Sequence, residues 1–229
     1  MIDKEVIVKE YVSSYTFTRY QKIYLRLKRL FDFILAILLS IVLSPVMLVA
    51  AIWIKYESKG PVIFKQRRPG YRQNIFTMYK FRSMRTELVS SADGHFLTSE
   101  ERLTKSGKLL RKTSIDELPQ LWNIIKGEMS FIGPRPFLIN DLGTYSEDQL
   151  IRFELLPGIT SWTAIHGRAS VDIQDKYNHE IYYVNNVGLR IDFEIFFKTI
   201  WIIFSRSDVE DKVLRIGAEI IEDDVKGER

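Results

Sequence analysis

The longest apolar segment of this chain runs from Leu30 to Ile54 and contains one charged residue, Asp32. Leucine, isoleucine, valine and phenylalanine fill 16 of its 25 positions. Together these side chains favour insertion into a bilayer by about 5 to 10 kcal/mol. A soluble core helix of this length and uniform apolarity is unusual. The pattern therefore predicts a membrane-embedded segment.

Ser44 and Pro45 interrupt this segment. As one straight helix the segment would be about 37 Å long, enough to span a bilayer. Proline removes a backbone hydrogen bond and kinks a helix, and the Ser44 hydroxyl can bond a carbonyl that the kink frees. Neither half is long enough to cross a bilayer alone. We therefore predict a break in the helix at Ser44-Pro45.

Basic residues flank the apolar segment equally on its two sides. The five before it are Arg19, Lys22, Arg26, Lys28 and Arg29, and the five after it are Lys55, Lys59, Lys65, Arg67 and Arg68. Since an excess of lysine and arginine marks the cytoplasmic flank, equal flanks favour a segment that enters and leaves the same face. We expect a re-entrant helix-break-helix. A kinked transmembrane span is the alternative, because spans tolerate proline.

The remaining pattern predicts a small, mostly helical α+β domain. Alternation indicates a β-hairpin with strands at 62–64 and 75–82 and a turn at Arg68-Pro69-Gly70. The polar stretch 86–99 predicts a mobile loop. Apolar periodicity predicts helices at 21–29, 100–112, 116–127 and 190–205. The last carries an aromatic face and is too short and too charged to span, so this helix either lies at the membrane interface or packs in the core.

Length and composition suit one membrane element and one domain of ordinary size. We divide the 229 residues into a variable arm, 1–20, a basic approach with the re-entrant helix, 21–58, a cytoplasmic catalytic domain, 59–206, and a tail, 207–229. The net charge of +4 comes partly from the clusters beside the apolar segment, which predict contacts with anionic lipid headgroups. Nucleic acid is the competing partner, but no motif for it is present.

Some functional classes are excluded by the composition. The chain has no cysteine, which rules out disulfides, thiolate zinc sites and cysteine nucleophiles. The apolar segment starts late and is too long for a signal peptide, so we expect no cleaved leader. The histidines His95, His166 and His179 lie far apart without metal-ligand spacing and are predicted to be structural.

The densest local signal lies between residues 110 and 136. Ser114 and Glu117 form a capping-box pattern, so a helix is predicted to start near Asp116 and to end at Gly127. Acidic residues in a first turn have an ordinary explanation, because they offset the helix dipole. The same helix start is also an anion site whose free N–H groups can hold a phosphate.

The pattern alone favours the ordinary explanation, but cations near this pair of carboxylates also suggest a chemical one. Arg111 and Lys112 precede the pair, and prolines on both sides fix the backbone of Arg135, whose planar fork suits phosphate. Adjacent carboxylates among cations, near a membrane segment, suggest metal-assisted phosphoryl transfer. One carboxylate would be the nucleophile and the other a magnesium ligand.

Several motifs give the chain a resemblance to a known family. They are Ser44-Pro45, QRRPG at 66–70, YKFRSM at 79–84, LRKTSIDELPQLWNIIKGEMSFIGPRP at 110–136 and PGIT at 157–160. With these motifs the chain resembles the bacterial sugar transferases, the monotopic phosphoglycosyl transferase family, in its small catalytic-domain type. The resemblance covers residues 22–206.

This resemblance implies an activity and a site. The family transfers a sugar-1-phosphate from a UDP-sugar to polyprenyl phosphate at the cytoplasmic face of the bacterial inner membrane, with magnesium, and releases UMP. The re-entrant break of the family falls on Ser44-Pro45. Its other functional positions fall on a nucleophilic aspartate, Asp116, a magnesium-associated glutamate, Glu117, and phosphate-contacting residues, Lys80, Arg111, Arg135 and Arg168.

One segment departs from the family pattern. The usual PGITGWAQVNGR reads PGITSWTAIHGR here, with Ser161, Thr163, Ala164 and His166 at changed positions. If this loop touches nucleotide or sugar, its specificity is unusual. The sugar, the glycan pathway and a homo-oligomeric state stay open.

Two other functional classes compete with the enzyme. One is a non-catalytic membrane-anchored binding or scaffold protein, and the other is an anchored nucleic-acid-binding regulator suggested only by the sequence pI of about 9.1. UMP release from a UDP-sugar distinguishes the enzyme from both.

Overall fold

The computed structural model describes residues 15–86, 97–139, 142, 145–146, 148–167 and 172–205. Its helices are α1 (Arg19–Val42), α2 (Ser44–Glu57), α3 (Ser99–Arg102), α4 (Lys105–Lys112), α5 (Gln120–Lys126), α6 (Trp162–Ile165), α7 (Ile173–Asn186) and α8 (Leu189–Ser205). Its strands are β1 (Ile63–Pro69), β2 (Ile75–Phe81), β3 (Ser130–Ile132) and β4 (Gly158–Thr160). Three 3₁₀ turns complete the described elements: η1 (Tyr71–Gln73), η2 (Ile115–Glu117) and η4 (Asp148–Glu154). The predicted mixture of helices with a short hairpin is confirmed.

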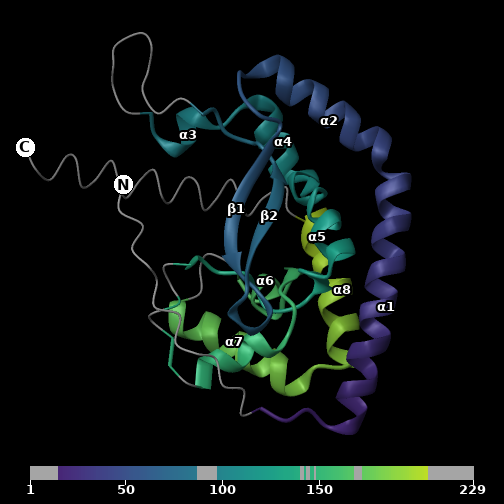
Figure 1. Cartoon of the computed structure of the whole chain (residues 1–229). Coiled ribbons are helices and arrows are strands. Elements are labelled where there is room, and N and C mark those ends of the chain that lie inside the picture. Colours follow the sequence, from purple (N-terminus) through teal and green to yellow (C-terminus); the bar gives the residue numbers. More distant parts are fainter. Residues whose placement is uncertain are drawn as a thin grey trace, which may run out of the picture.

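The apolar segment forms the bent pair α1 and α2, which runs along one side of the molecule (Figure 1). The predicted break is confirmed, and its chemistry is local. Pro45 has no N–H to donate to the carbonyl of Ile41, and the Ser44 hydroxyl donates to that carbonyl instead, at 2.7 Å. The predicted basic approach helix is the first part of α1, which a capping box of Thr18 and Gln21 starts at Arg19.

No single helix in the described part of the chain is long and apolar enough to cross a membrane. The α1–α2 pair meets that test jointly, by length and composition, with a bend of 61°.

Both halves of the helix pair pack on the same globular domain. Ala36 of α1 lies in a core cluster with Met78 and Ile124. Ala50 and Ile54 of α2 lie in another cluster, with Phe81 and Leu110. The apolar side chains around the bend are exposed, among them Ile41, Val42, Leu48 and Val49. The bend is therefore the part of the pair that the domain covers least.

The antiparallel hairpin of β1 and β2 runs in register from Ile63 opposite Phe81 to Pro69 opposite Ile75. The predicted second strand is confirmed, but the first is longer than the predicted 62–64. The predicted turn at Arg68-Pro69-Gly70 was wrong, because Pro69 still belongs to β1. Proline is tolerated there since both strands of a two-stranded sheet are edge strands. The chain reverses at η1, where Arg72 and Gln73 have positive φ.

Asn123 docks α5 on the hairpin. Its side chain is completely buried, accepts a hydrogen bond from the Tyr79 N–H at 3.1 Å and donates one to the Thr77 carbonyl at 2.7 Å. Arg29 of α1 caps the other end of α5 by donating to the Ile124 carbonyl at 2.7 Å. Gly127 ends α5 as predicted, with φ of 85°. The flanking cation Arg29 is thus used inside the protein rather than at a headgroup.

The helix predicted at 100–112 is in fact two helices, α3 and α4. They separate at Thr104, whose hydroxyl accepts a hydrogen bond from the Gly107 N–H at 3.0 Å and so caps α4. Gly107 packs directly against the chain at Ser83, because a Cβ there would lie 1.9 Å from the Ser83 carbonyl oxygen. Most of the loop predicted at 86–99 lies outside the described residues.

The C-terminal half contains elements that the pattern did not predict. β3 and β4 form a parallel pair, and α7 follows them, where the pattern predicted no strand or helix. The predicted helix at 190–205 is confirmed as α8. It contributes Ile191 and Ile195 to the core, whereas its aromatic face, with Phe197 and Trp201, is exposed. The helix therefore packs in the core through its other face, while the predicted aromatic face is left exposed.

Candidate active site

The hairpin brings a cation to the adjacent carboxylates. Lys80, near the end of β2, pairs with Glu117 of η2, with 2.8 Å between Nζ and Oε1. Both side chains are partly exposed, so a ligand can reach them. Residues 37 positions apart in the chain thus form one charged cluster.

The start of this region differs from the predicted helix. Pro119 has no N–H to donate to the Ile115 carbonyl, which accepts from the Leu118 N–H instead, so η2 is a 3₁₀ turn. Ser114 takes a left-handed conformation with φ of 57° and makes no capping hydrogen bond. The predicted capping box and helix start at Asp116 were therefore wrong, since α5 begins at Gln120. A dipole argument for an anion site does not apply to so short a turn.

Asp116 is buried, with 9% of its surface exposed. Burial, followed by the neighbouring charge of Glu117, raises the pKa of the Asp116 carboxyl to about 6, although Lys80 and Arg111 act in the opposite direction. At neutral pH the carboxylate form still predominates by about tenfold. Asp116 is therefore a poorly solvated anion in the reach of two cations, which is a suitable state for a nucleophile.

Arg111 lies in the last turn of α4. Its Nε donates to the Ser83 hydroxyl at 2.9 Å, which fixes the plane of the guanidinium. The two terminal nitrogens have no hydrogen bond within the described residues. Such a fork is oriented yet available, as bidentate phosphate binding requires.

Arg135 does not join this cluster. Its N–H donates to Glu180 at 2.9 Å, and the carbonyl of the next residue, Pro136, accepts from Arg68 at 3.2 Å. Arg68 pairs with Phe76, which lies about 13 Å along β2 from Lys80. No ion pair or hydrogen bond links Arg135 to the two carboxylates in the described part of the chain. Its grouping with them near one helix start is not confirmed, and its role toward phosphate stays a prediction.

No sequence pattern pointed to Glu180, which is buried beside the Arg135 backbone. One carboxylate oxygen accepts from the Arg135 N–H and the other from the Thr163 hydroxyl at 2.6 Å. Burial raises the pKa of Glu180, and the Arg152 guanidinium opposes that shift. Arg152 also donates to the Arg135 carbonyl. The unusual Thr163 is therefore part of the support that holds the Arg135 backbone.

The other predicted positions lie elsewhere. Arg168 and His95 are outside the described residues. The histidines are not all apart, because the rings of His166 and His179 lie 5.3 Å from each other. Ser161 caps α6 by accepting from the Ala164 N–H at 3.0 Å.

A magnesium ion would find a protein ligand in the carboxylate of Glu117, beside the predicted nucleophile Asp116. The described residues contain no group of three or more acidic, histidine or cysteine side chains that could enclose a metal. Magnesium does not need one, since it usually keeps several waters and takes one or two carboxylates together with substrate phosphates. The hard oxygen donors of Glu117 fit that pattern.

Comparison with known proteins identifies relatives. A family model described as bacterial sugar transferase matches residues 23–206. The uncharacterized sugar transferase EpsL of Bacillus subtilis is 44% identical over 174 residues, which are 76% of this chain and 85% of that protein. UDP-N-acetylgalactosamine-undecaprenyl-phosphate N-acetylgalactosaminephosphotransferase of Aeromonas hydrophila is 39% identical over 78% of this chain. Undecaprenyl-phosphate galactose phosphotransferase of Salmonella typhimurium is 35% identical over 79%. The chain spans less than half of the latter two, 44% and 41% of their lengths.

Proposed function

Because this chain belongs to the bacterial sugar transferase family, we propose that it transfers a sugar-1-phosphate from a UDP-sugar to polyprenyl phosphate and releases UMP. Relatives named as undecaprenyl-phosphate phosphotransferases of different sugars support this reaction class. The observation that carries the proposal is the site itself. A buried aspartate, ionised at neutral pH, stands beside a Lys80–Glu117 ion pair and the oriented fork of Arg111.

Transfer proceeds in two displacement steps. In the first, a carboxylate oxygen of Asp116 attacks the phosphorus that carries the sugar, and the bond from that phosphorus to the oxygen of UMP breaks, so UMP leaves with the electron pair. In the second, an oxygen of polyprenyl phosphate attacks the same phosphorus and Asp116 leaves as a carboxylate. Neither step needs a proton transfer, because nucleophiles and leaving groups are anions.

The neighbouring residues of this chain oppose the negative charge. Lys80 and Arg111 bind and orient the diphosphate, and Arg135 binds a more distant part of the donor or acceptor. Glu117 would hold magnesium, which supplies charge neutralisation for the leaving UMP. The reaction belongs at the cytoplasmic face of a bacterial membrane, where a polyprenyl acceptor must remain within the bilayer.

UMP release tests this function directly. A panel of UDP-sugars is incubated with the purified protein, magnesium and polyprenyl phosphate, and UMP is measured. We expect release from one or a few donors, with formation of the matching lipid-linked sugar diphosphate. If no UDP-sugar in the panel released UMP, the proposal would be contradicted, and the alternative of a non-catalytic scaffold protein would be favoured.

The raised pKa of Asp116 predicts an acid limb in the pH profile. Protonation removes the nucleophile, so kcat/KM should rise with pH up to about 6 and level off above it. Because Lys80 lowers the pKa of Asp116, Lys80→Met should shift this limb to higher pH besides reducing the rate. The matched control is Lys65→Met, an exposed lysine of β1. An acid limb at the same pH in both variants would contradict the electrostatic role of Lys80.

We further propose that α1 and α2 form a re-entrant hairpin. Three observations support this topology: equal basic flanks, the break at Ser44-Pro45, and the packing of both halves on one domain. A domain that contacts both halves keeps their outer ends on its own side of the bilayer, while the exposed apolar bend enters the lipid.

Single cysteines test this topology, since the chain has none of its own. Tyr20→Cys in the first turn of α1 and Tyr56→Cys in the last turn of α2 replace side chains that are 61% and 93% exposed. Both should be protected from an impermeant thiol reagent in intact cells and become labelled after lysis. Labelling of one position alone in intact cells would establish a span instead.

A further inference from the structure

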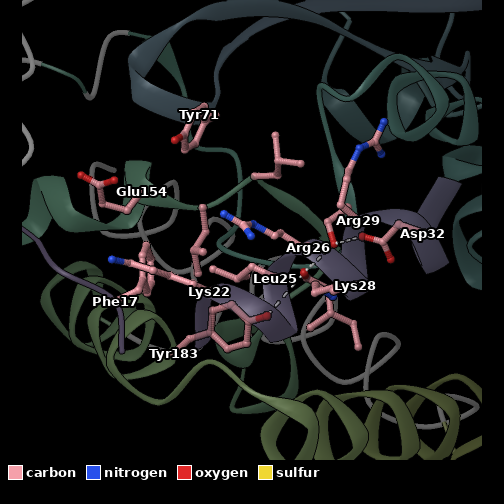
Figure 2. Close-up of a pocket in the computed structure, with 14 residues that line it drawn as sticks. Phe17, Lys22, Leu25, Arg26, Lys28, Arg29, Asp32, Tyr71, Glu154 and Tyr183 are labelled. Carbon is pink, nitrogen blue, oxygen red and sulfur yellow. Dashed lines mark hydrogen bonds between the residues drawn. The ribbon is translucent and has the colours of Figure 1, made fainter. Parts of the chain in front are cut away.

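A cavity lies at the foot of α1, away from the Asp116 and Glu117 carboxylates. Its volume is about 370 Å³, and it is bounded by the first turns of α1, by β3 and by residues 154–156. Figure 2 shows Lys22, Leu25 and Arg26 of α1 on one side of it, with Tyr71 and Glu154 across from them. None of the proposed catalytic or phosphate-binding residues that the structure describes lines this cavity. A ligand in this cavity would therefore be separate from the diphosphate at the carboxylates.

The walls of the cavity combine apolar surface with free cations. Leu25, Leu155 and Leu156 contribute apolar walls. Lys22 and Arg26, one helical turn apart, are exposed and have no side-chain partner among the described residues. This combination suits a ligand that has both an anionic group and an apolar part.

Other charged groups of the cavity are already engaged. Lys28 pairs with Asp192 at 2.8 Å, and Arg29 donates to the Ile124 carbonyl. Asp32 accepts from the Ser130 hydroxyl at 2.6 Å, and Glu154 is buried with a partner of its own. Among the described residues, four basic and two acidic side chains line the cavity, and this excess of positive charge favours an anion.

The position of α1 determines the level of the cavity relative to the membrane. Arg26 lies four residues, about 6 Å of helix, before Leu30, where the apolar segment begins. If this segment inserts as proposed, Lys22 and Arg26 stand at the level of the lipid headgroups. A phosphate there would place the attached apolar chains beside the membrane part of α1.

The cavity also lies far from the proposed nucleophile, Asp116. Tyr71 marks the turn end of the hairpin, and β2 then covers about 17 Å from Ile75 to Lys80. A phosphate bound near Arg26 is therefore too far from Asp116 to react with it. This argues for a resident lipid rather than the acceptor substrate.

We propose that this cavity binds the headgroup of an anionic glycerophospholipid, with Lys22 and Arg26 on its phosphate and the leucines beside its apolar chains. Such a lipid joins α1 to the β3 side of the domain and fixes the angle at which the domain meets the membrane. The proposal rests on the membrane insertion argued above.

Lipid binding can be measured without turnover. Delipidated full-length protein in a neutral detergent is titrated with short-chain phosphatidylglycerol or with phosphatidylcholine of the same chain length, and bound lipid is counted by native mass spectrometry. We expect at least about tenfold tighter binding of phosphatidylglycerol. The double variant Lys22→Gln/Arg26→Gln should lose about tenfold in this affinity. Both side chains are exposed, and circular dichroism verifies that the variant is folded.

A second double variant on the other basic flank distinguishes a specific lipid site from general attraction of anionic lipid to basic residues. Lys55→Gln/Lys59→Gln removes the same charge from the other flank and should leave phosphatidylglycerol affinity within about twofold. Equal losses in the two double variants would overturn the site. So would equal binding of the two lipids, or competition by glycerol phosphate, inorganic phosphate or a short polyprenyl phosphate as strong as that of phosphatidylglycerol.

The outcomes separate this site from the proposed function. A protein that releases UMP yet binds both lipids equally would lose the lipid site alone. A protein that binds phosphatidylglycerol selectively but releases no UMP from any donor would lose the transferase proposal alone.

Discussion

Asp116→Asn should lower sugar-phosphate transfer by at least about a thousandfold while the protein stays folded. The amide has nearly the same size as the carboxyl but cannot form the covalent bond to phosphorus. Since Asp116 is buried and its pKa is raised mainly by that burial, removing its charge also removes a desolvation cost. The thermal midpoint of the variant should therefore equal or exceed that of the wild type.

The covalent intermediate can be trapped before the acceptor is added. Wild-type enzyme quenched with UDP-sugar alone should carry a sugar phosphate on the peptide that contains Asp116, and steady-state kinetics should be ping-pong. Asp116→Asn should show neither the adduct nor a burst of UMP. Near-normal turnover of this variant, or an adduct on Glu117, would overturn the assignment of the nucleophile.

Removal of magnesium is expected to abolish transfer, and Glu117→Gln should lower turnover by about a hundredfold or more. The amide oxygen of glutamine can still accept from Lys80 but offers the metal no charge. Activity in chelator should return on addition of magnesium, and the variant should need a higher magnesium concentration. Because Glu117 raises the pKa of Asp116, its neutralisation should also move the acid limb to lower pH.

An exposed glutamate elsewhere provides the control for this substitution. Glu194→Gln removes one charge from α8, where Glu194 pairs with Lys198 on the surface, and should leave the magnesium dependence unchanged. Full wild-type activity in the presence of chelator would refute the metal role of Glu117.

Several elements follow from the sequence because their causes are local. The apolar segment follows from its composition alone. Its break follows from the missing N–H of Pro45 and from the hydroxyl of the neighbouring Ser44. The second hairpin strand follows from alternation, and the end of α5 follows from Gly127. Local reasoning failed where neighbours competed. The capping box predicted at Ser114 does not form, because Pro119 leaves only a 3₁₀ turn after it. The single helix predicted at 100–112 is divided by the N-cap at Thr104.

The site was identifiable from the sequence only as a pair of carboxylates with a family motif. Tertiary structure decided which cations lie beside them, because Lys80 reaches Glu117 only when Asn123 docks α5 on β2. It also separated Arg135 from that cluster and joined it to Glu180 and Thr163, which no spacing indicates. Residue types and short periods determine what each segment can form. Burial, and with it the pKa of Asp116, depends on contacts between segments that are distant in the chain.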